Sequence, residues 1–152
     1  RMTTFPLYLF VYGTLQSGLS NTRHMYNCQF VGKGKTIEKF ALYVDDYPFV
    51  TRKNEITQIS GEIYLISDQQ TLDRLDRFES HPTWYYRDIC LVVKESSGET
   101  IQAHLYFNEN MDIEKASVEL VSSGDYRLSS QVINRSWLKE EDDLDSPPAG
   151  RK

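Results

Sequence analysis

Two stretches of the chain are apolar at nearly every position, and each predicts a β-strand buried on both faces. The first is Leu7–Tyr12, which is rich in residues that favour strands. In the second, Ile59–Ile66, one face carries Ile59 and Ile63, while Tyr64 makes the opposite face apolar as well. A strand without a polar face needs cover on both sides. Both stretches are therefore expected in the core of the fold.

A helical pattern follows the second strand. Leu72, Leu75 and Phe78 recur every three residues, which places them on one face, and charged residues fill most positions between them. Ser67, followed three residues later by a glutamine, fits a capping box and is the expected N-cap. Pro82 is expected to stop the helix, because the residue before a proline avoids helical dihedral angles.

The remaining elements have weaker patterns. Tyr85–Lys94 and Thr100–Phe107 predict two strands joined by a hairpin turn at Gly98. Residues 131–138 fit neither a helix nor a strand clearly. Other expected elements are a short helix over 21–26 capped by Ser20 or Asn21, one or two strands with a glycine kink over 28–44, turns over 45–48 and 53–55 around an extended piece at 49–50, a short helix over 112–121 and a loop over 123–127.

The length and composition indicate one soluble globular domain. At 152 residues the chain is expected to bury about 70% of its unfolded surface. It has 22 acidic and 17 basic residues, a net charge of -5, and shows no basic patch, which argues against a nucleic-acid partner. We assign the domain to residues 2–138. The acidic, proline-containing residues 139–152 are expected to form a flexible tail.

The cysteines and the apolar runs bear on location. Cys28 and Cys90 are too few and too far apart for a disulfide framework or a zinc site, and their apolar neighbours predict buried free thiols. His24, His81 and His104 do not have the spacing of metal ligands. No apolar run approaches the roughly 18 residues of a membrane span, and no signal-peptide pattern is visible. We expect a cytoplasmic protein that has no cofactor and no membrane contact.

The first predicted strand ends in a glycine bend, Gly13-Thr14-Leu15, which is a candidate binding element. Successive backbone N–H groups in such a bend form an anion-binding nest, and the missing Cβ of Gly13 permits close approach of a ligand. A tight turn off a core strand has the same pattern, and the bend alone does not distinguish the two.

Three acidic residues lie on or beside the predicted helix, and they are not equivalent. Asp73 and Asp76 have arginine neighbours, with Asp73 and Arg77 four residues apart, which predicts solvated ion pairs on the helix face. Glu79 instead follows the apolar Phe78 where the helix ends. The helix dipole and burial both disfavour a carboxylate there, which suits a group that exchanges protons. An exposed glutamate at the helix end is the alternative.

Six motifs occur in an order and spacing that together resemble one superfamily. They are VYGTL at Val11–Leu15, YP at Tyr47–Pro48, GEIY at Gly61–Tyr64, LDRLDRFES at Leu72–Ser80, YxR at Tyr85–Arg87 and GDYR at Gly124–Arg127. Over about residues 7 to 128, the chain is similar to the γ-glutamylcyclotransferase-like superfamily. The phrase FESHPTWYYR most resembles its γ-glutamylamine cyclotransferases, and YGTL in place of YGSL fits less well with the glutathione-specific branch.

The resemblance implies an α+β fold, a small mixed β-barrel flanked by helices. It also implies a reaction in which the α-amine of a γ-glutamyl amide attacks its own γ-carbonyl, closes 5-oxoproline and expels an amine. By resemblance Glu79 is the acid/base, and Tyr12, Gly13, Thr14 and Leu15 form the substrate cradle. Tyr126 matches an aromatic position near the family's active sites, although packing explains it equally well.

Three functions follow from these observations. We favour a cyclotransferase for γ-glutamyl amines, such as γ-glutamyl-ε-lysine. The rivals are a cyclotransferase for γ-glutamyl α-amino acids and a non-catalytic ligand-binding module of the same fold. The presence of Glu79 argues against the binding module, which needs no proton shuttle. Whether the bend holds the oxyanion or the substrate's α-carboxylate stays open at this point.

Overall fold

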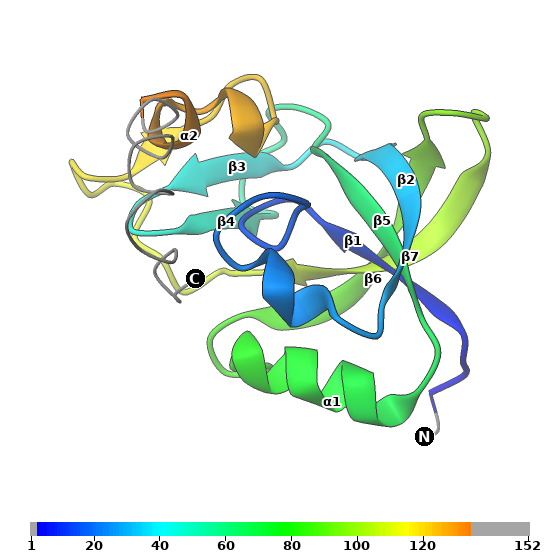
Figure 1. The fold of residues 1–152 in the computed structure, drawn as a ribbon. Helices are drawn as coiled ribbons and strands as arrows, with labels where there is room; N and C mark the ends of the chain where they lie inside the picture. Colours follow the sequence, from blue (N-terminus) through cyan, green and yellow to red (C-terminus); the bar gives the residue numbers. More distant parts are fainter. Residues whose placement is uncertain (1–2, 135–152) are drawn as a thin grey trace, which may run out of the picture.

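The strand β1 (Leu7–Val11) belongs to a small closed β-barrel in the computed structural model, which describes residues 3–134 (Figure 1). The other four barrel strands are β5 (Ser60–Ile66), β2 (Gln29–Thr36), β6 (Tyr86–Lys94) and β7 (Thr100–Phe107), in that order around the barrel. Neighbouring strands are antiparallel, except that β7 closes the barrel by pairing in parallel with β1. This mixed barrel with outer helices confirms the predicted α+β class.

Three short strands extend the sheet beyond β7. β4 (Pro48–Thr51) pairs with β7, β3 (Ala41–Val44) pairs with β4, and β8 (Glu119–Leu120) pairs with β3. The helical elements are η1 (Thr22–Met25), α1 (Gln69–Phe78), η2 (Tyr126–Leu128) and α2 (Ser130–Ile133). Figure 1 shows α1 below the barrel, with β3, η2 and α2 toward the opposite end.

The apolar patterns of β1 and β5 reflect cover on both faces, as predicted. Phe10 and Ile63 point into the barrel interior and are buried there. Leu9 and Ile66 point outward and form a second core with the helix residue Leu72. Fully burying a side chain of this size contributes about 1.5–3 kcal/mol. The outward-facing residues of β1 and β5 therefore fix α1 against the barrel.

Helix α1 begins at a residue other than the predicted one and ends, as predicted, directly before Glu79. Its N-cap is Asp68 rather than Ser67, and an Asp68 carboxylate oxygen accepts a 2.8 Å hydrogen bond from the Thr71 N–H. Aspartate and serine are similarly good N-caps, so the pattern alone did not identify the residue. At the other end the helix stops at Phe78, ahead of the proline, and Ser80 takes a left-handed conformation with φ of 57°.

The segment 112–121 is the clearest error of the sequence analysis, because it forms no helix. Its end is the strand β8, and the Val121 N–H that follows donates to the Leu42 carbonyl at 2.8 Å. The side chains of Ile113 and Val118 pack against the outer core. Tertiary pairing with β3 thus decides the structure of a segment whose own pattern was weak.

Two other predicted elements occur near the expected residues but differ in length or type. The helix expected over 21–26 is the shorter 3-10 turn η1, and η2 occupies the end of the loop expected over 123–127. Both cysteines are free, but Cys28 is only partly buried. Residues 135–138 and the expected tail 139–152 lie outside the described residues. Within residues 3–134, no helix has the length and apolarity needed to cross a membrane.

Candidate active site

A pocket opens where β1 ends, beside the C-terminal end of α1. The bend after β1, the start of β4 and the end of α1 meet there, and tyrosines next to β6 and on β7 complete the walls. The lining residues are Phe10, Val11, Tyr12, Gly13, Thr14, Leu15, Tyr47, Pro48, Phe78, Glu79, Tyr85 and Tyr106. The fold therefore brings the candidate residues 12–15 and Glu79 to one pocket, although they lie far apart in the chain.

The bend uses its carbonyl groups internally. The Gly13 carbonyl accepts a 3.1 Å hydrogen bond from the Gln16 N–H, and the Thr14 carbonyl accepts a 2.9 Å bond from the Asn21 N–H. Within the described part of the chain, the N–H groups of Gly13, Thr14 and Leu15 donate to no protein acceptor. These three adjacent donors line the pocket and are available to an anionic group.

Gly13 is needed because β4 begins close to the bend. A Cβ atom at position 13 would lie 2.7 Å from Cγ of Pro48, which is shorter than side-chain contacts in real proteins. Any larger residue would displace the bend or Pro48. The motifs VYGTL and YP are therefore in direct contact in the fold.

Glu79 is the C-cap of α1, and only 9% of the residue is exposed. Its N–H donates to the Leu75 carbonyl at 3.0 Å. Burial raises the pKa of Tyr12, Tyr85 and Tyr106, and the negative charge of Glu79 raises the pKa of each of them further. The carboxyl group of Glu79 is therefore surrounded by hydroxyl groups that stay protonated at neutral pH.

The tyrosine hydroxyls hold the pocket walls together. The Tyr12 hydroxyl donates to the Tyr106 carbonyl at 2.8 Å and accepts from the Val50 N–H at 3.2 Å. The Tyr85 hydroxyl donates to the Pro48 carbonyl at 2.8 Å. These bonds connect the bend to β4 and β7, so the wall opposite Glu79 is fixed by backbone contacts.

Asp76 does not make the solvated helix-face pair predicted for it. Its side chain is only 16% exposed and forms two hydrogen bonds with Arg87 of β6, at 2.9 and 3.0 Å. It also accepts a 2.6 Å bond from the Tyr106 hydroxyl. His104 is the fourth ionisable member of this network, and its Nδ1 lies 2.8 Å from the Arg87 guanidinium. This network ties the last turns of α1 to the barrel, directly before Glu79.

Asp73, in contrast, is exposed as predicted, although its partner is a different one. It accepts a 2.8 Å hydrogen bond from the side chain of Gln69, and the expected pair with Arg77 is absent from the ion pairs of residues 3–134. Of the two aspartates in the motif, only Asp76 has a structural role at the site.

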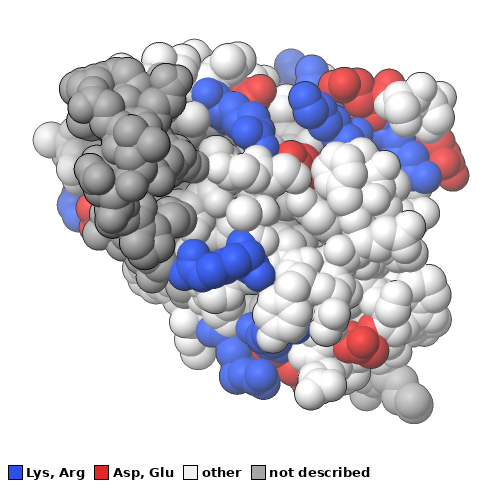
Figure 2. Space-filling model, in the orientation of Figure 1, with Lys and Arg blue, Asp and Glu red and all other residues white. Residues whose placement is uncertain are grey.

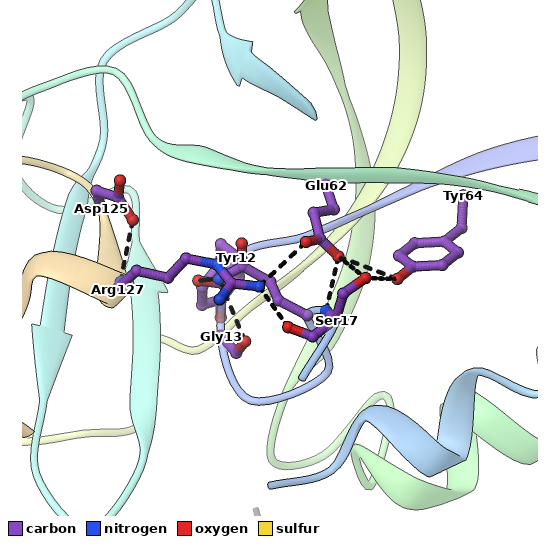
Figure 3. A network of polar contacts seen from close by, with 8 residues as sticks. Tyr12, Gly13, Ser17, Glu62, Tyr64, Asp125 and Arg127 are labelled. Carbon is purple, nitrogen blue, oxygen red and sulfur yellow. Dashed lines mark hydrogen bonds and ion pairs between the residues drawn. The ribbon is translucent and has the colours of Figure 1, made fainter. Parts of the chain in front are cut away.

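An ion pair between a buried glutamate and a partly exposed arginine supports the bend (Figure 3). Glu62 of β5 is 3% exposed and pairs with Arg127 of η2 at 3.1 Å. The other Glu62 oxygen accepts hydrogen bonds from the N–H and hydroxyl of Ser17 and from the hydroxyl of Tyr64, at 2.8, 3.1 and 3.0 Å. Arg127 also donates to the Ser17 carbonyl at 2.6 Å. Ser17, four residues after Gly13, is therefore held on both of its backbone polar groups.

The family model described as "Gamma-glutamyl cyclotransferase, AIG2-like" matches residues 9–128. The chain belongs to this family. A protein of Methanocaldococcus jannaschii, whose name gives gamma-glutamylcyclotransferase as a provisional assignment, is 42% identical over 121 residues, covering 79% of this chain and 95% of that protein. Gamma-glutamylaminecyclotransferase A of Danio rerio is 32% identical over 114 residues, covering 68% and 70%. The crystal structure of an AIG2-like protein from Mus musculus superposes with a TM-score of 0.70 at 28% identity, covering 78% and 88%.

In this member of the AIG2-like family, Tyr126 does not line the pocket. Its side chain packs in the barrel core and its hydroxyl donates to the Gln131 side chain at 2.6 Å. The GDYR motif contributes Arg127 instead, together with Asp125, whose side chain accepts from the Arg127 N–H at 3.0 Å. Gly124 is required because its φ is 75° and a Cβ there would lie 2.1 Å from the Gln58 carbonyl oxygen.

The Glu62–Arg127 pair, which supports the bend, was not predicted from the sequence. The available signal was an acidic residue in the middle of an otherwise apolar strand, which must find a partner when it is buried. The arginine partner lies 65 residues further along the chain, and no local pattern pairs the two.

The histidines of the AIG2-like domain have structural contacts. His81 Nδ1 accepts from the Arg87 N–H at 2.9 Å, and His24 stacks on Phe78 with ring centroids 4.2 Å apart. Burial and the nearby Arg87 lower the pKa of His104, so its neutral ring accepts from that guanidinium. Among residues 3–134, no group of three or more His, Cys, Asp or Glu side chains is arranged to hold a metal ion.

Proposed function

We propose that this chain is a γ-glutamylamine cyclotransferase, which converts a γ-glutamyl amine to 5-oxoproline and a free amine. The substrate we propose is γ-glutamyl-ε-lysine, and lysine is then the amine released. Membership of the family supports the reaction type. The amine as leaving group is supported by relatives named for that activity, such as the Danio rerio protein, and by the residues that line the pocket.

In the proposed reaction the substrate's α-amino nitrogen attacks its own γ-carbonyl carbon. The nitrogen loses a proton to the Glu79 carboxylate, the carbonyl oxygen takes the negative charge, and a five-membered lactam closes. The carbonyl then re-forms, the bond to the leaving nitrogen breaks, and Glu79 returns the proton to that nitrogen. The same carboxyl group accepts the proton and gives it back, and no water is consumed.

The bend is proposed to hold the substrate in the folded geometry that this attack requires. Its three N–H donors at Gly13, Thr14 and Leu15 suit either the α-carboxylate or the developing oxyanion. Keeping amine and carbonyl in contact supplies much of the rate, since well-oriented intramolecular attack lowers a barrier by about 7–11 kcal/mol. The side chains of Tyr12 and Tyr85, whose hydroxyl groups stay protonated because their pKa is raised, line the pocket around the bound substrate.

The observation that carries the choice of substrate is the absence of a cation from the pocket. No Lys or Arg is among its lining residues within the described chain. Arg87, the one fixed cation of the FESHPTWYYR segment, is instead bonded to Asp76 and His104. A γ-glutamyl α-amino acid has a carboxylate on the carbon next to the scissile nitrogen, and burying that charge without a partner is costly. The ε-amine of lysine has only a methylene there.

The test compares kcat/KM for γ-glutamyl-ε-lysine and γ-glutamyl-α-alanine on one enzyme preparation, with 5-oxoproline detected by mass. We expect the isopeptide to react at least about tenfold faster, the ratio that corresponds to 1.4 kcal/mol. Equal values or the reverse order would assign the protein to the α-amino acid branch. If a panel of γ-glutamyl amides gave no 5-oxoproline, the protein would be a binding module.

A cytoplasmic location is part of the same proposal. Cys28 and Cys90 are both free thiols, and free thiols are typical of a reducing compartment.

A further inference from the structure

A second cavity lies on the outer face of the barrel, over β2 and β5. Its volume is about 390 Å³, within the range of about 300–1,000 Å³ that is usual for small-molecule pockets. It has no lining residue in common with the pocket that contains Glu79. A ligand could therefore occupy it without entering the candidate active site.

Basic side chains from two elements, β2 and η2, line this cavity. Lys33 and Lys35 are two residues apart on β2, so both side chains lie on the same, exposed face of the strand. Gly34, between them, packs against Ile63 and Val92 so closely that a Cβ would lie within 3 Å of each. Arg127 contributes from η2. In the orientation of Figure 1, where β2 and β5 lie at the upper right, Figure 2 shows blue side chains, with red ones between them, along the upper edge of the molecule.

These basic groups retain donors that no described residue uses. Neither Lys33 nor Lys35 takes part in an ion pair within residues 3–134. Arg127 directs only its Nη2 atom to Glu62 and Ser17. Its Nη1 and Nε atoms make no hydrogen bond with the described chain, so both remain available at the cavity wall.

Two acidic residues also line the cavity, and they do not cancel this charge. Asp125 already accepts a hydrogen bond from the Arg127 N–H through one of its carboxylate oxygens. Glu95 lies at the exposed edge, next to Lys33 across the sheet. Three basic against two acidic residues leave this cavity with a formal charge of 3 − 2 = +1, on a chain whose net charge is -5. Glu62, which does not line the cavity, pairs with Arg127, so the positive charge at the cavity is that of Lys33 and Lys35.

We propose that this cavity is a second ligand site, which binds a small molecule carrying carboxylate groups. Lys33 and Lys35 bind the ligand from β2 and Arg127 binds it from η2. Charge-assisted hydrogen bonds from ammonium and guanidinium groups are the recognition chemistry that carboxylates require. Lys33 and Lys35 have no part in the proposed reaction, and Arg127 supports the bend through its Nη2 atom alone, so the site does not depend on the proposed function.

The experiment is a titration of the ¹⁵N-labelled protein with glutarate, followed by amide NMR. Cadaverine, which has the same number of carbons and the opposite charge, is the matched control ligand. We expect saturable shifts for the amides of Gly34 and Gly61, which line the cavity, and no saturable shifts there with cadaverine. The double variant Lys33→Gln/Lys35→Gln should bind glutarate at least about tenfold more weakly, as expected for the loss of charged hydrogen bonds. The control variant Lys39→Gln/Lys53→Gln, which changes two exposed lysines outside the cavity, should bind it as the parent does.

Three outcomes would overturn the proposal. One is that glutarate shifts only the amides of Gly13, Thr14 and Leu15, which would place it in the pocket beside Glu79. Another is that Lys33→Gln/Lys35→Gln and Lys39→Gln/Lys53→Gln bind glutarate equally well. The third is tighter binding of cadaverine than of glutarate. Because all four lysines are exposed, both double variants are expected to fold, and their thermal unfolding is measured alongside.

Discussion

The hydroxyl group of Tyr106 donates a 2.6 Å hydrogen bond to the carboxylate of Asp76, three residues before Glu79. The same carboxylate is paired with Arg87 of β6. One side chain of α1 is thus bonded to two barrel strands at the point where the helix delivers its terminal glutamate to the pocket.

We expect Asp76→Asn to lower both stability and activity. Asparagine keeps the size of the side chain but leaves the Arg87 charge without its partner, which costs about 1–3 kcal/mol for a partly buried pair. Thermal unfolding and the rate of 5-oxoproline formation are the measurements. Asp73→Asn, on the exposed side of the same helix, is the matched control and should change neither. Equal behaviour of the two variants would mean that the Asp76 network is dispensable.

The same carboxylate predicts a pH dependence of stability. Burial alone would raise the pKa of Asp76, but the hydrogen bonds from Arg87 and Tyr106 outweigh it, so its pKa is lowered in the folded state. The group binds a proton more readily when unfolded, with an ordinary pKa of about 3.9. Its stabilising contribution is therefore complete above that value and is lost as the pH falls through the folded-state pKa.

The difference in unfolding free energy between the parent and Asp76→Asn should accordingly shrink as the pH falls from about 5 to about 2. Urea unfolding at several pH values measures it. A difference that stays constant over this range would show that the charge of Asp76 does not stabilise the fold.

Glu62→Gln should destabilise the support beneath the bend. A glutamine amide cannot accept from Arg127 and Ser17 as the carboxylate does, and Arg127 loses its partner, at a cost of about 2–3 kcal/mol. The bend is held through Ser17, so kcat should fall as well. Glu99→Gln, which removes an exposed pair with Lys94, should have little effect on either quantity. An unchanged kcat in Glu62→Gln would show that the ion pair is not needed to hold the bend in its active geometry.

Gly13→Ala should reduce kcat/KM by at least about tenfold, because displacement of a binding group by about 1 Å can cost 10²-fold. The added Cβ would meet Cγ of Pro48 at 2.7 Å. If this contact is the cause, the loss should be smaller when the alanine is introduced into Pro48→Ala, where Cγ is absent. A loss of equal size in both backgrounds would contradict the steric explanation and indicate that Gly13 is needed for its conformation instead.

The strands of the barrel were predictable because their cause is local. Leu7–Val11 is apolar throughout because both of its faces are covered, and Leu72 and Leu75 repeat at helical spacing because one helix face packs on the barrel. The position of Glu79 after an apolar helix face was visible too, but an exposed glutamate fits that position as well, and its role as acid/base was predicted from the resemblance of the motifs. These signals are contained in stretches of ten residues or so.

The remaining features depend on partners far away in the chain. The sequence around Asp76 predicts an exposed residue, whereas in the structure it is bonded to Arg87 and Tyr106. Segment 112–121 has the pattern of a weak helix, whereas its end pairs with β3. For Tyr126 the sequence left a place near the substrate and a packing role equally open; its side chain packs in the core, and its neighbour Arg127 makes the contact with the loop after the bend. A single sequence contains no record of such pairings.

The central claim is that Glu79 transfers both protons, and Glu79→Gln tests it most directly. Glutamine keeps the size of the side chain but cannot accept a proton. The measurement is the rate of 5-oxoproline release from γ-glutamyl-ε-lysine, with Glu38→Gln, an exposed glutamate outside the pocket, as the matched control. We predict a loss of at least about 10²-fold in kcat, the lower end for positioned acid–base catalysis, with an unchanged melting temperature. A Glu79→Gln enzyme within about tenfold of the parent rate would contradict the account.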